Sequence, residues 1–205
     1  MFIGIKNIIF DLCGPIITLD LELMNRRFHE FGVTVEKPYQ LLRNAGLTKL
    51  YESGRVSTED FCDQVRQLLA TQLTREQIID AWNTLIVDFP QRHIEYIRQL
   101  HKRYRLFLLS NSDVTNAQFF KDYLNRHAGF DFVNDCFDEV FFSCELYDRK
   151  PSPAVFRHIV DKHGLIPEET LVVDDCLAHC EGAASIGLRT HWLRPDEDIC
   201  DLKLE

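Results

Sequence analysis

The sequence predicts an α/β protein with a doubly wound, Rossmann-like parallel sheet and a small helical domain inserted after the first strand. The first observation is a set of short apolar runs bounded by polar or turn residues, which are typical of strands buried on both faces. They occupy residues 8–10, 106–109, 140–142, 171–173 and 190–193. The second observation is helical spacing between these runs, and the third is a long interval without strands after the first run.

Helices are predicted where apolar residues recur at a spacing of three or four. Ile94, Ile97 and Leu100 predict a helix before the second strand, and Phe156 with Ile159 predicts one before the fourth. Strands and helices therefore alternate along the chain. This alternation is typical of a parallel sheet with helices on both of its faces.

The interval from about residue 20 to residue 88 contains no convincing strand and three amphipathic helical patterns. Their apolar faces contain Leu23, Phe28 and Phe31; Phe61, Val65, Leu68 and Leu69; and Ile78, Ile79, Trp82 and Leu85. Ser57 or Thr58 is expected to cap the second of these helices. An all-helical insertion of this length predicts a cap domain at residues 18–88, with residues 1–17 and 89–205 forming the α/β core.

Charge and composition exclude several classes of partner. The chain has 205 residues and a net charge of -9, which disfavours binding to nucleic acid or to an anionic membrane. The seven cysteines are irregularly spaced, so reduced thiols and a cytoplasmic location are expected.

The basic segment at residues 101–105 is interpreted as the solvated end of a helix. The charged segment at residues 195–205 is expected to be loosely held.

Polar side chains follow the predicted strands where ligands bind in open parallel sheets. These side chains are Asp11, Ser110, Asn111, Lys150, Asp174 and Asp175. Paired carboxylates suit Mg²⁺, which is commonly held by one or two carboxylates together with water and substrate phosphate. A hydroxyl group and an ammonium group are natural donors to phosphate. Together they predict a site for phosphoryl transfer.

Four segments in order resemble the motifs of the haloacid dehalogenase (HAD) superfamily. They read IIFDLCGPI, FLLSNS, DRKPSPAVF and LVVDDCLAHCEGAASIGLRTHW, and they span nearly the whole chain. The segment LYESGRVSTEDF is similar to a branch of HAD phosphatases with a small helical cap. That branch includes bacterial enzymes that act on sugar phosphates such as glucose 1-phosphate.

The resemblance implies a nucleophile and a Mg²⁺ site. Asp11 would attack phosphorus to give an aspartyl-phosphate, which water then hydrolyses. Asp11 and the backbone carbonyl of Cys13 would both bind Mg²⁺. Asp175 would bind the metal directly, and Asp174 would bind it through water or stand behind the direct ligands.

The resemblance also implies how the phosphoryl group is held. Ser110 would donate a hydrogen bond to its oxygens, with Asn111 beside it in the substrate-binding turn. Lys150 would neutralise the charge of both the nucleophile and the phosphate. The expected partner is therefore a small phosphorylated substrate.

Cys13 departs from the pattern of many HAD phosphatases, which have a second aspartate two residues after the nucleophile. That aspartate acts as the general acid and base, and a thiol with a pKa near 8.5 replaces it poorly. Losing such catalysis typically costs ~10²- to 10⁴-fold in rate. The sugar-phosphatase branch often has glycine there, so activity is still expected. The prediction is a slow or narrowly selective Mg²⁺-dependent phosphatase, with a sugar phosphate as the favoured substrate.

Two alternatives belong to other functional classes. A 2-haloacid dehalogenase also lacks the second aspartate, but such enzymes use no metal, so the Asp174–Asp175 pair favours the phosphatase. A non-enzymatic HAD-fold binding protein is the second alternative. It is favoured by Cys13 and by Pro15, which would stiffen a loop that must move. It is disfavoured because a degraded site would be expected to have lost at least one of the four residues Asp11, Ser110, Lys150 and Asp175, and all are present.

The remaining polar residues are weaker candidates for the site. Cys176, His179 and Cys180 lie at helical spacing and would suit a soft metal, although helix surface and packing are the preferred interpretation. Asp20 and Asp113 lie near the predicted site edge without independent support. Within the cap, the polar residues considered as substrate-selecting are Arg43, Asn44 and Glu52.

Overall fold

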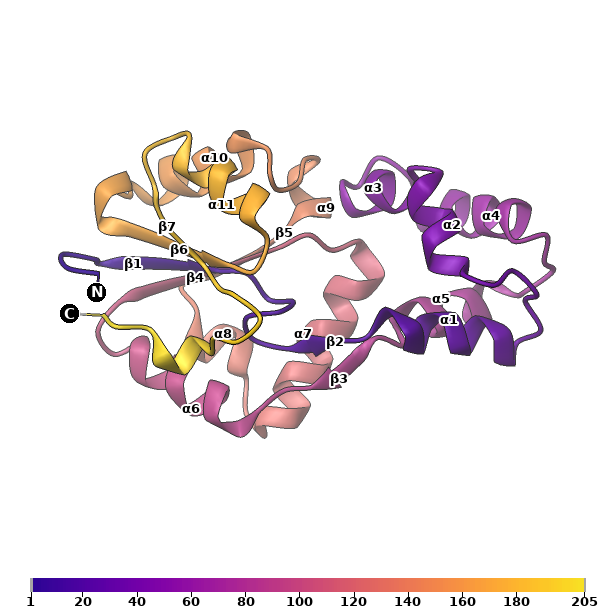
Figure 1. Cartoon of the computed structure of the whole chain (residues 1–205), viewed down its shortest axis with the longest axis horizontal. Coiled ribbons are helices and arrows are strands. Elements are labelled where there is room, and N and C mark those ends of the chain that lie inside the picture. The colour runs from indigo at the N-terminus through magenta and orange to yellow at the C-terminus, as the bar shows by residue number, and fades with distance from the viewer. Residues whose placement is uncertain (1, 205) are drawn as a thin grey trace.

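Within residues 2–204, which the computed structural model describes, five parallel strands form the central sheet in the order β5-β4-β1-β6-β7 (Figure 1). They are β1 (Asn7–Phe10), β4 (Arg105–Ser110), β5 (Glu139–Phe142), β6 (Thr170–Asp174) and β7 (Arg189–Trp192). Each strand coincides with one of the apolar runs, and β1 lies at the centre, paired with β4 and β6. The predicted parallel α/β fold is confirmed.

Helices cover both faces of this sheet. Figure 1 shows α10 and α11 on one face and α6 and α8 on the other. The helices that follow or precede the strands are α6 (Gln91–Leu100), α7 (Val114–Ala128), α8 (Phe132–Cys136), α9 (Ser143–Leu146), α10 (Pro153–His163) and α11 (Leu177–Ala184). Two short 3₁₀ helices are η1 (Pro167–Glu169) and η2 (Ile199–Asp201).

The alternation of side chains along each strand explains why the sheet is buried on both sides. Ile9 and Phe107 join a hydrophobic cluster with Phe156 of α10. Ile8 joins a separate cluster that contains Ile97 of α6. Successive residues of one strand therefore contribute to opposite halves of the core.

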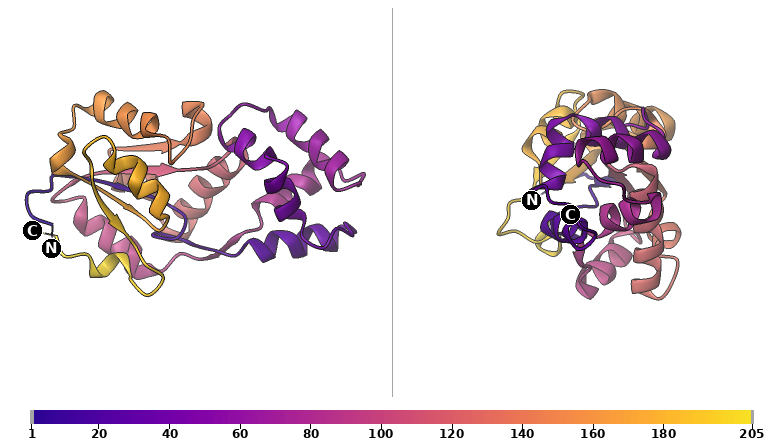
Figure 2. Two further views of the ribbon diagram at one scale, coloured as in Figure 1. Left: turned by 45° about the horizontal axis from the view of Figure 1, so that its top comes forward. Right: turned by 90° about the vertical axis from the view of Figure 1, so that its right-hand side faces the viewer.

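The interval after β1 contains five helices and, contrary to the sequence prediction, a strand. The helices are α1 (Leu21–Glu30), α2 (Pro38–Asn44), α3 (Leu47–Glu52), α4 (Thr58–Leu68) and α5 (Arg75–Asn83). The strand β3 (Ile86–Asp88) pairs antiparallel with β2 (Thr18–Leu19). Strands of two or three residues are too short to show an alternation of apolar and polar residues in the sequence. They form because they pair with each other. Figures 1 and 2 show the five helices at one end of the molecule, beyond this ribbon.

Side-chain caps fix where several of the inserted helices begin. Ser57 is the N-cap of α4, where its hydroxyl oxygen accepts a hydrogen bond from the Asp60 amide at 3.1 Å. Asp20, considered above as a site residue, instead caps α1 and accepts a hydrogen bond from the Glu22 amide at 2.9 Å. None of the helices among the described residues is long and apolar enough to cross a membrane.

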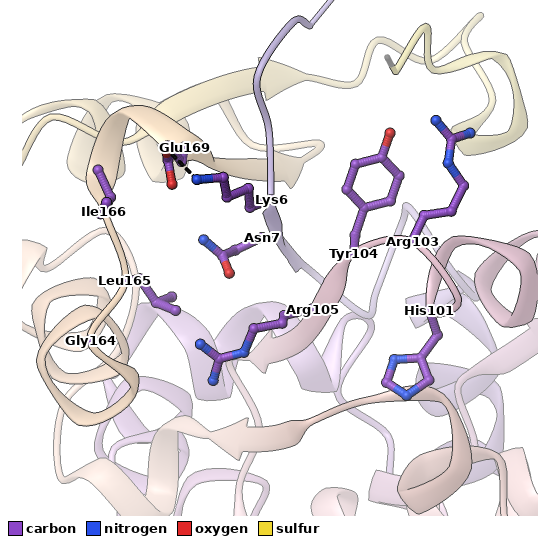
Figure 3. A pocket seen from close by; sticks show the side chains of 10 residues that line it. All are labelled: Lys6, Asn7, His101, Arg103, Tyr104, Arg105, Gly164, Leu165, Ile166 and Glu169. Atoms are coloured by element: carbon purple, nitrogen blue, oxygen red, sulfur yellow. Dashed lines mark hydrogen bonds and ion pairs between the residues drawn. The ribbon is translucent and has the colours of Figure 1, made fainter.

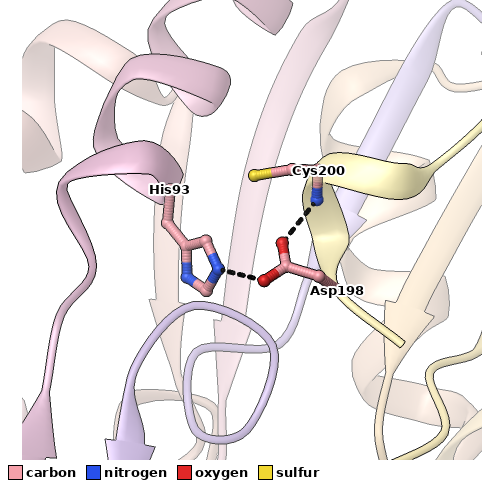
Figure 4. A group of neighbouring side chains, drawn as sticks. All are labelled: His93, Asp198 and Cys200. Carbon is pink, nitrogen blue, oxygen red and sulfur yellow. Dashed lines mark hydrogen bonds and ion pairs between the residues drawn. The ribbon is translucent and has the colours of Figure 1, made fainter. Parts of the chain in front are cut away.

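The segment near the C-terminus is not loosely held over residues 195–204, the part that the structure describes. Ile199 is fully buried in the core. Asp198 accepts a hydrogen bond from Arg92 at 2.6 Å and lies 3.1 Å from Nε2 of His93 (Figure 4). The other ring nitrogen of His93 lies 2.9 Å from the carbonyl oxygen of Ile16, in the loop after β1. Burial of one apolar residue and pairing of one carboxylate therefore outweigh the charged composition.

The replacement Asp198→Asn is expected to lower the free energy of unfolding by about 1 kcal/mol at pH 7. Partial burial alone would raise the pKa of Asp198, but hydrogen bonds from Cys200 and His93, together with that from Arg92, lower it. A carboxylate with a lowered native pKa stabilises the fold above about pH 4 and loses that effect as the pH falls. Urea denaturation of both proteins at pH 7 and pH 3.5 checks this, because their difference should shrink at the lower pH.

Asp196→Asn provides the matched control, since Asp196 is exposed two residues away. It should leave the free energy of unfolding unchanged at both pH values. If the free energy of unfolding of Asp198→Asn lies below that of the wild type by the same amount at pH 3.5 as at pH 7, an electrostatic role for Asp198 is contradicted.

Candidate active site

Three strands end in polar residues at the same edge of the sheet. Asp11 directly follows β1, Ser110 is the last residue of β4, and Asp174 is the last residue of β6. The parallel register places Phe10 opposite both Leu108 and Val173, so the three strand ends are nearly level. Side chains predicted from separate parts of the chain therefore lie together.

Lys150 is the centre of this group. Its ammonium nitrogen lies 2.8 Å from Oδ1 of Asp11 and 2.7 Å from Oδ2 of Asp174. The Lys150 side chain is only 1% exposed, and that of Asp174 is fully buried. A single buried cation thus contacts two buried carboxylates.

Asn111 holds the backbone on which Lys150 sits. Its side-chain amide donates to the carbonyl oxygen of Lys150 at 3.0 Å, and its side-chain oxygen accepts from the Lys150 amide at 2.9 Å. The side chain predicted to bind substrate is thus paired with the chain segment that carries the lysine. A direct contact between Asn111 and substrate stays a prediction.

Burial and charge shift the pKa values in opposite directions. Burial raises the pKa of Asp11 to about 6, with Lys150 offsetting part of the rise. Burial alone would raise the pKa of Asp174, but Lys150 and a hydrogen bond from His179 hold it below its usual value. Burial would lower the pKa of Lys150, but the charges of Asp11 and Asp174 raise it. The group therefore contains a charged lysine and an excess of carboxylates.

Ser110 is fully buried beside these charges. Its hydroxyl oxygen lies 2.8 Å from that of Ser112. A serine hydroxyl in this position is a ready donor to a phosphoryl oxygen.

Cys13 carries a protonated thiol at neutral pH. Burial, and then the negative charge of Asp11, raise the pKa of this thiol well above its ordinary value. A thiol in this state cannot accept a proton from water. The weak general acid and base catalysis expected of Cys13 stays a prediction.

Asp175 lies against the loop that follows Asp11. A Cβ atom on Gly14 would come within 2.2 Å of Oδ2 of Asp175, so the absence of a side chain at Gly14 permits this approach. Gly14 also has a φ of 104°, which favours glycine. Burial, and then the charge of Asp174, raise the pKa of Asp175.

The donor set fits Mg²⁺. Lys150 lowers the pKa of all three carboxylates, those of Asp11, Asp174 and Asp175, and His179 lowers the pKa of the last two. A hard divalent cation with oxygen ligands would balance the remaining negative charge. The roles predicted for these residues as metal ligands remain predictions.

His179, which was predicted to be helix surface or packing with a soft-metal ligand as the alternative, is a neighbour of the site. Its Nδ1 lies 2.9 Å from Oδ1 of Asp174, and the Cys176 amide donates to the same oxygen at 2.9 Å. The Cys180 thiol faces the Asp174 backbone carbonyl at 3.7 Å. These three residues thus surround Asp174. Asp11, Asp174 and His179 offer ligand atoms close enough together to hold one cation, as do His93, Asp198 and Cys200 elsewhere in the described part of the chain. The position of His179 could have been predicted from its place in the sequence. A helix that begins directly after β6 brings its first turn close to Asp174 at the end of that strand.

Asp113 has a structural role. It caps α7 through hydrogen bonds from Thr115 and Asn116. It also accepts a hydrogen bond from the indole nitrogen of Trp82 at 2.7 Å. Because Trp82 belongs to α5, this bond joins the inserted helices to the core. Arg43 and Asn44 are exposed at the end of α2.

A cavity at the opposite edge of the sheet contains none of the predicted site residues. It has a volume of about 470 Å³ and lies at the start of β1 and β4 (Figure 3). Lys6 in this cavity is paired with Glu169 at 2.8 Å, and Arg105 contacts His163. The basic segment at residues 101–105 lines part of it. Ligands of open parallel sheets bind at the other edge.

Comparison with known proteins places these features in a family. The model of the haloacid dehalogenase-like hydrolases matches residues 5–187. The chain is 28% identical over 189 residues to a D-ribitol-5-phosphate phosphatase of Bacteroides thetaiotaomicron, covering 91% of this chain and 90% of that protein.

Solved structures give the same picture. A HAD family enzyme of Bacteroides thetaiotaomicron in complex with magnesium and inorganic phosphate is 29% identical, with a TM-score of 0.86 and coverage of 96% of this chain and 98% of that one. A predicted HAD-like family hydrolase of Porphyromonas gingivalis is 32% identical, with a TM-score of 0.81 and coverage of 95% and 93%. An L-2-haloacid dehalogenase of Xanthobacter autotrophicus, 19% identical with a TM-score of 0.64, covers 92% of this chain and 77% of that one and shares the fold.

Proposed function

The chain belongs to the haloacid dehalogenase-like hydrolases, and we propose that it is a Mg²⁺-dependent phosphatase that hydrolyses a small phosphorylated sugar or polyol. The observation that carries this proposal is the contact of buried Lys150 with both Asp11 and Asp174 at the carboxyl edge of the sheet. The relative that acts on D-ribitol 5-phosphate supports the substrate class. The related structure with magnesium and phosphate supports the cofactor.

Asp11 is the proposed nucleophile. One of its carboxylate oxygens would attack phosphorus while the bond from phosphorus to the ester oxygen breaks, giving an aspartyl-phosphate and an alcohol that takes its proton from water. A water molecule would then attack the same phosphorus, releasing inorganic phosphate and restoring the carboxylate. Lys150 would hold the charge of Asp11 and of the phosphoryl group, and Ser110 would donate to a phosphoryl oxygen.

Mg²⁺ would be held by Asp11, Asp175 and the backbone carbonyl of Cys13, with Asp174 behind them. When bound, it would neutralise charge on the phosphoryl group. The contribution of the protein is to place two carboxylates and a lysine in a buried group. The seven free cysteines, all in the described part of the chain, support a reducing compartment, and we propose the cytoplasm.

The inserted helices are proposed to act as a cap over this site, with boundaries at residues 18 and 88. Two contacts support the assignment. Trp82 of α5 donates to Asp113, and the carbonyl oxygen of Glu52, at the end of α3, accepts from the Ser143 hydroxyl at 2.5 Å. The cap would exclude water and contact the part of the substrate that carries the phosphate.

A phosphate-release assay over a panel of phosphorylated sugars and polyols tests the proposal. We expect turnover in Mg²⁺ and its loss in EDTA. Absence of turnover on every ester, with retained binding of inorganic phosphate, would favour the non-enzymatic binding protein. Chloride release from 2-haloacids in EDTA would favour the dehalogenase.

The replacement Cys13→Asp is expected to raise kcat by about 10- to 100-fold, because it supplies the missing general acid and base. The gain should be larger for esters of ordinary alcohols than for anomeric phosphates, whose leaving groups need less protonation. Steady-state kinetics with one ester of each kind measures it. Cys13→Asn is the matched control, since it has the same shape without proton transfer. An equal rise of kcat in both variants, or no rise in either, would contradict the interpretation that the enzyme lacks a general acid and base at position 13.

A further inference from the structure

Glu52 and Arg149 meet where the inserted helices contact the core. Glu52 is the last residue of α3, and Arg149 precedes Lys150 in the loop before α10. An Nη2 atom of Arg149 lies 3.0 Å from Oε2 of Glu52. Figure 1 shows α3 beside α9 at this junction, and the bond from Ser143 of α9 to the Glu52 carbonyl fixes the end of α3 there.

The pair leaves two buried polar atoms without a hydrogen bond. Among the described residues, four buried side-chain atoms lack such a partner, and two of them are Oε2 of Glu52 and Nε of Arg149. The 3.0 Å contact of Oε2 with Nη2 of Arg149 is an ion pair without the geometry of a hydrogen bond, and Nε of Arg149 has no acceptor. An unpaired buried donor or acceptor costs about 1–3 kcal/mol, so its retention calls for a reason.

The charge of Glu52 is poorly compensated in this position. Burial raises the pKa of Glu52 to about 7, and Arg149 offsets only part of the rise. Asp113 raises the pKa further, and Arg43 lowers it. Burial, and then the charge of Glu52, raise the pKa of Tyr39. A stabilising surface ion pair would not show these features.

We propose that Glu52 and Arg149 are specificity-determining residues that bind a hydroxyl group on the alcohol part of the substrate. A hydroxyl group is both a donor and an acceptor, so one such group can donate to Oε2 of Glu52 and accept from Nε of Arg149. A methylene group can do neither, and a phosphoryl oxygen can only accept. The substrate class is then a phosphate ester with a free hydroxyl group, as in polyol and sugar phosphates.

The position of Arg149 supports a site near the reacting phosphate. Arg149 adjoins Lys150, whose ammonium group contacts the proposed nucleophile Asp11. Glu52 comes from the proposed cap, so the pair would couple recognition of the hydroxyl group to closure of the cap over the site. This inference rests on the proposed phosphatase function and assigns the residues that select its substrate.

Steady-state kinetics with D-ribitol 5-phosphate and phenyl phosphate tests the inference, because phenyl phosphate has no hydroxyl group. The quantity compared is kcat/KM for D-ribitol 5-phosphate divided by kcat/KM for phenyl phosphate. We expect Glu52→Ala and Arg149→Met each to lower this ratio by about 10- to 100-fold, mostly by raising KM for the polyol ester. Glu52→Gln should recover most of this ratio, because its amide oxygen still accepts a hydrogen bond. Glu36→Ala, an exposed change in the same insertion, is the matched control.

An equal decrease of kcat/KM for both esters would overturn the inference, since it would indicate that Glu52 and Arg149 have a structural role where the inserted helices contact the core. An unchanged ratio would also overturn it, since water would then satisfy both atoms. If the wild type hydrolyses neither these two esters nor any other ester of the panel in Mg²⁺, the proposed function fails. Calorimetric binding of D-ribitol 5-phosphate to the wild type and to Glu52→Ala then decides the inference alone, with a loss of at least tenfold supporting it and equal affinity refuting it.

Discussion

Replacement of Asp11 by asparagine is expected to lower the phosphatase kcat by about 10⁴-fold or more. The amide cannot form the aspartyl-phosphate, whereas its shape is nearly unchanged. Asparagine can still accept the hydrogen bond that the Leu12 amide donates to Oδ1 at 2.7 Å. Lys150 keeps its contact with Asp174 at 2.7 Å, so the buried pair survives.

The same variant should be at least as stable as the wild type. Burial raises the pKa of Asp11 to about 6, which means that its ionised form is destabilised in the native state at neutral pH. Removing this charge leaves one lysine with one buried carboxylate. A variant that is inactive and yet equally or more stable would separate catalysis from folding, as expected for a site that sacrifices stability for function.

Phosphate release and urea denaturation at pH 7 together check this prediction. Asp20→Asn is the control, because asparagine caps a helix about as well as aspartate does and Asp20 caps α1. It should change neither kcat nor stability. An Asp11→Asn protein with kcat within tenfold of the wild type would place the nucleophile elsewhere.

The sheet and the residues at its edge were predictable because both are local signals. Buried parallel strands are continuous apolar runs, so Ile8, Ile9 and Phe10 mark a strand without knowledge of its partners. A polar residue directly after such a run must lie at the strand end. Asp11 and Asp174 could therefore be assigned to one edge as soon as the sheet was assumed to be parallel.

Features that depend on contacts between distant segments could not be predicted in this way. The ribbon of β2 and β3 forms only because its two short strands pair with each other. The segment containing Asp198 and Ile199 is charged, and its attachment depends on His93 and Arg92 about one hundred residues away. The partners of Glu52 are equally remote, since Arg149 and Ser143 follow it by more than ninety residues.

Replacement of Lys150 by methionine should have the largest effect on stability. It would leave Asp11 and Asp174 buried beside each other without a cation, and breaking a buried pair in this way costs about 3–5 kcal/mol. Because both carboxylates would then have raised pKa values, the deficit should be full at neutral pH and should shrink as the pH falls and they bind protons. Activity should fall by about 10³-fold or more, because the charge that stabilises the phosphoryl group is lost.

Urea denaturation at pH 7 and pH 5, with and without Mg²⁺, measures these effects. Lys162→Met is the matched control, because Lys162 pairs with Glu139 at the surface and such pairs contribute less than about 1 kcal/mol. If the three carboxylates hold Mg²⁺, the added cation should stabilise every protein that keeps the site, because binding to the native state alone stabilises it. Measured against the wild type in the same buffer, the deficit of Lys150→Met should become smaller in Mg²⁺, and the small deficit of Lys162→Met should stay the same. Equal deficits in the two variants would contradict the buried group. A deficit in Lys150→Met that Mg²⁺ leaves unchanged would contradict the metal site while leaving the ion pair intact, so the two parts of the site can be judged separately.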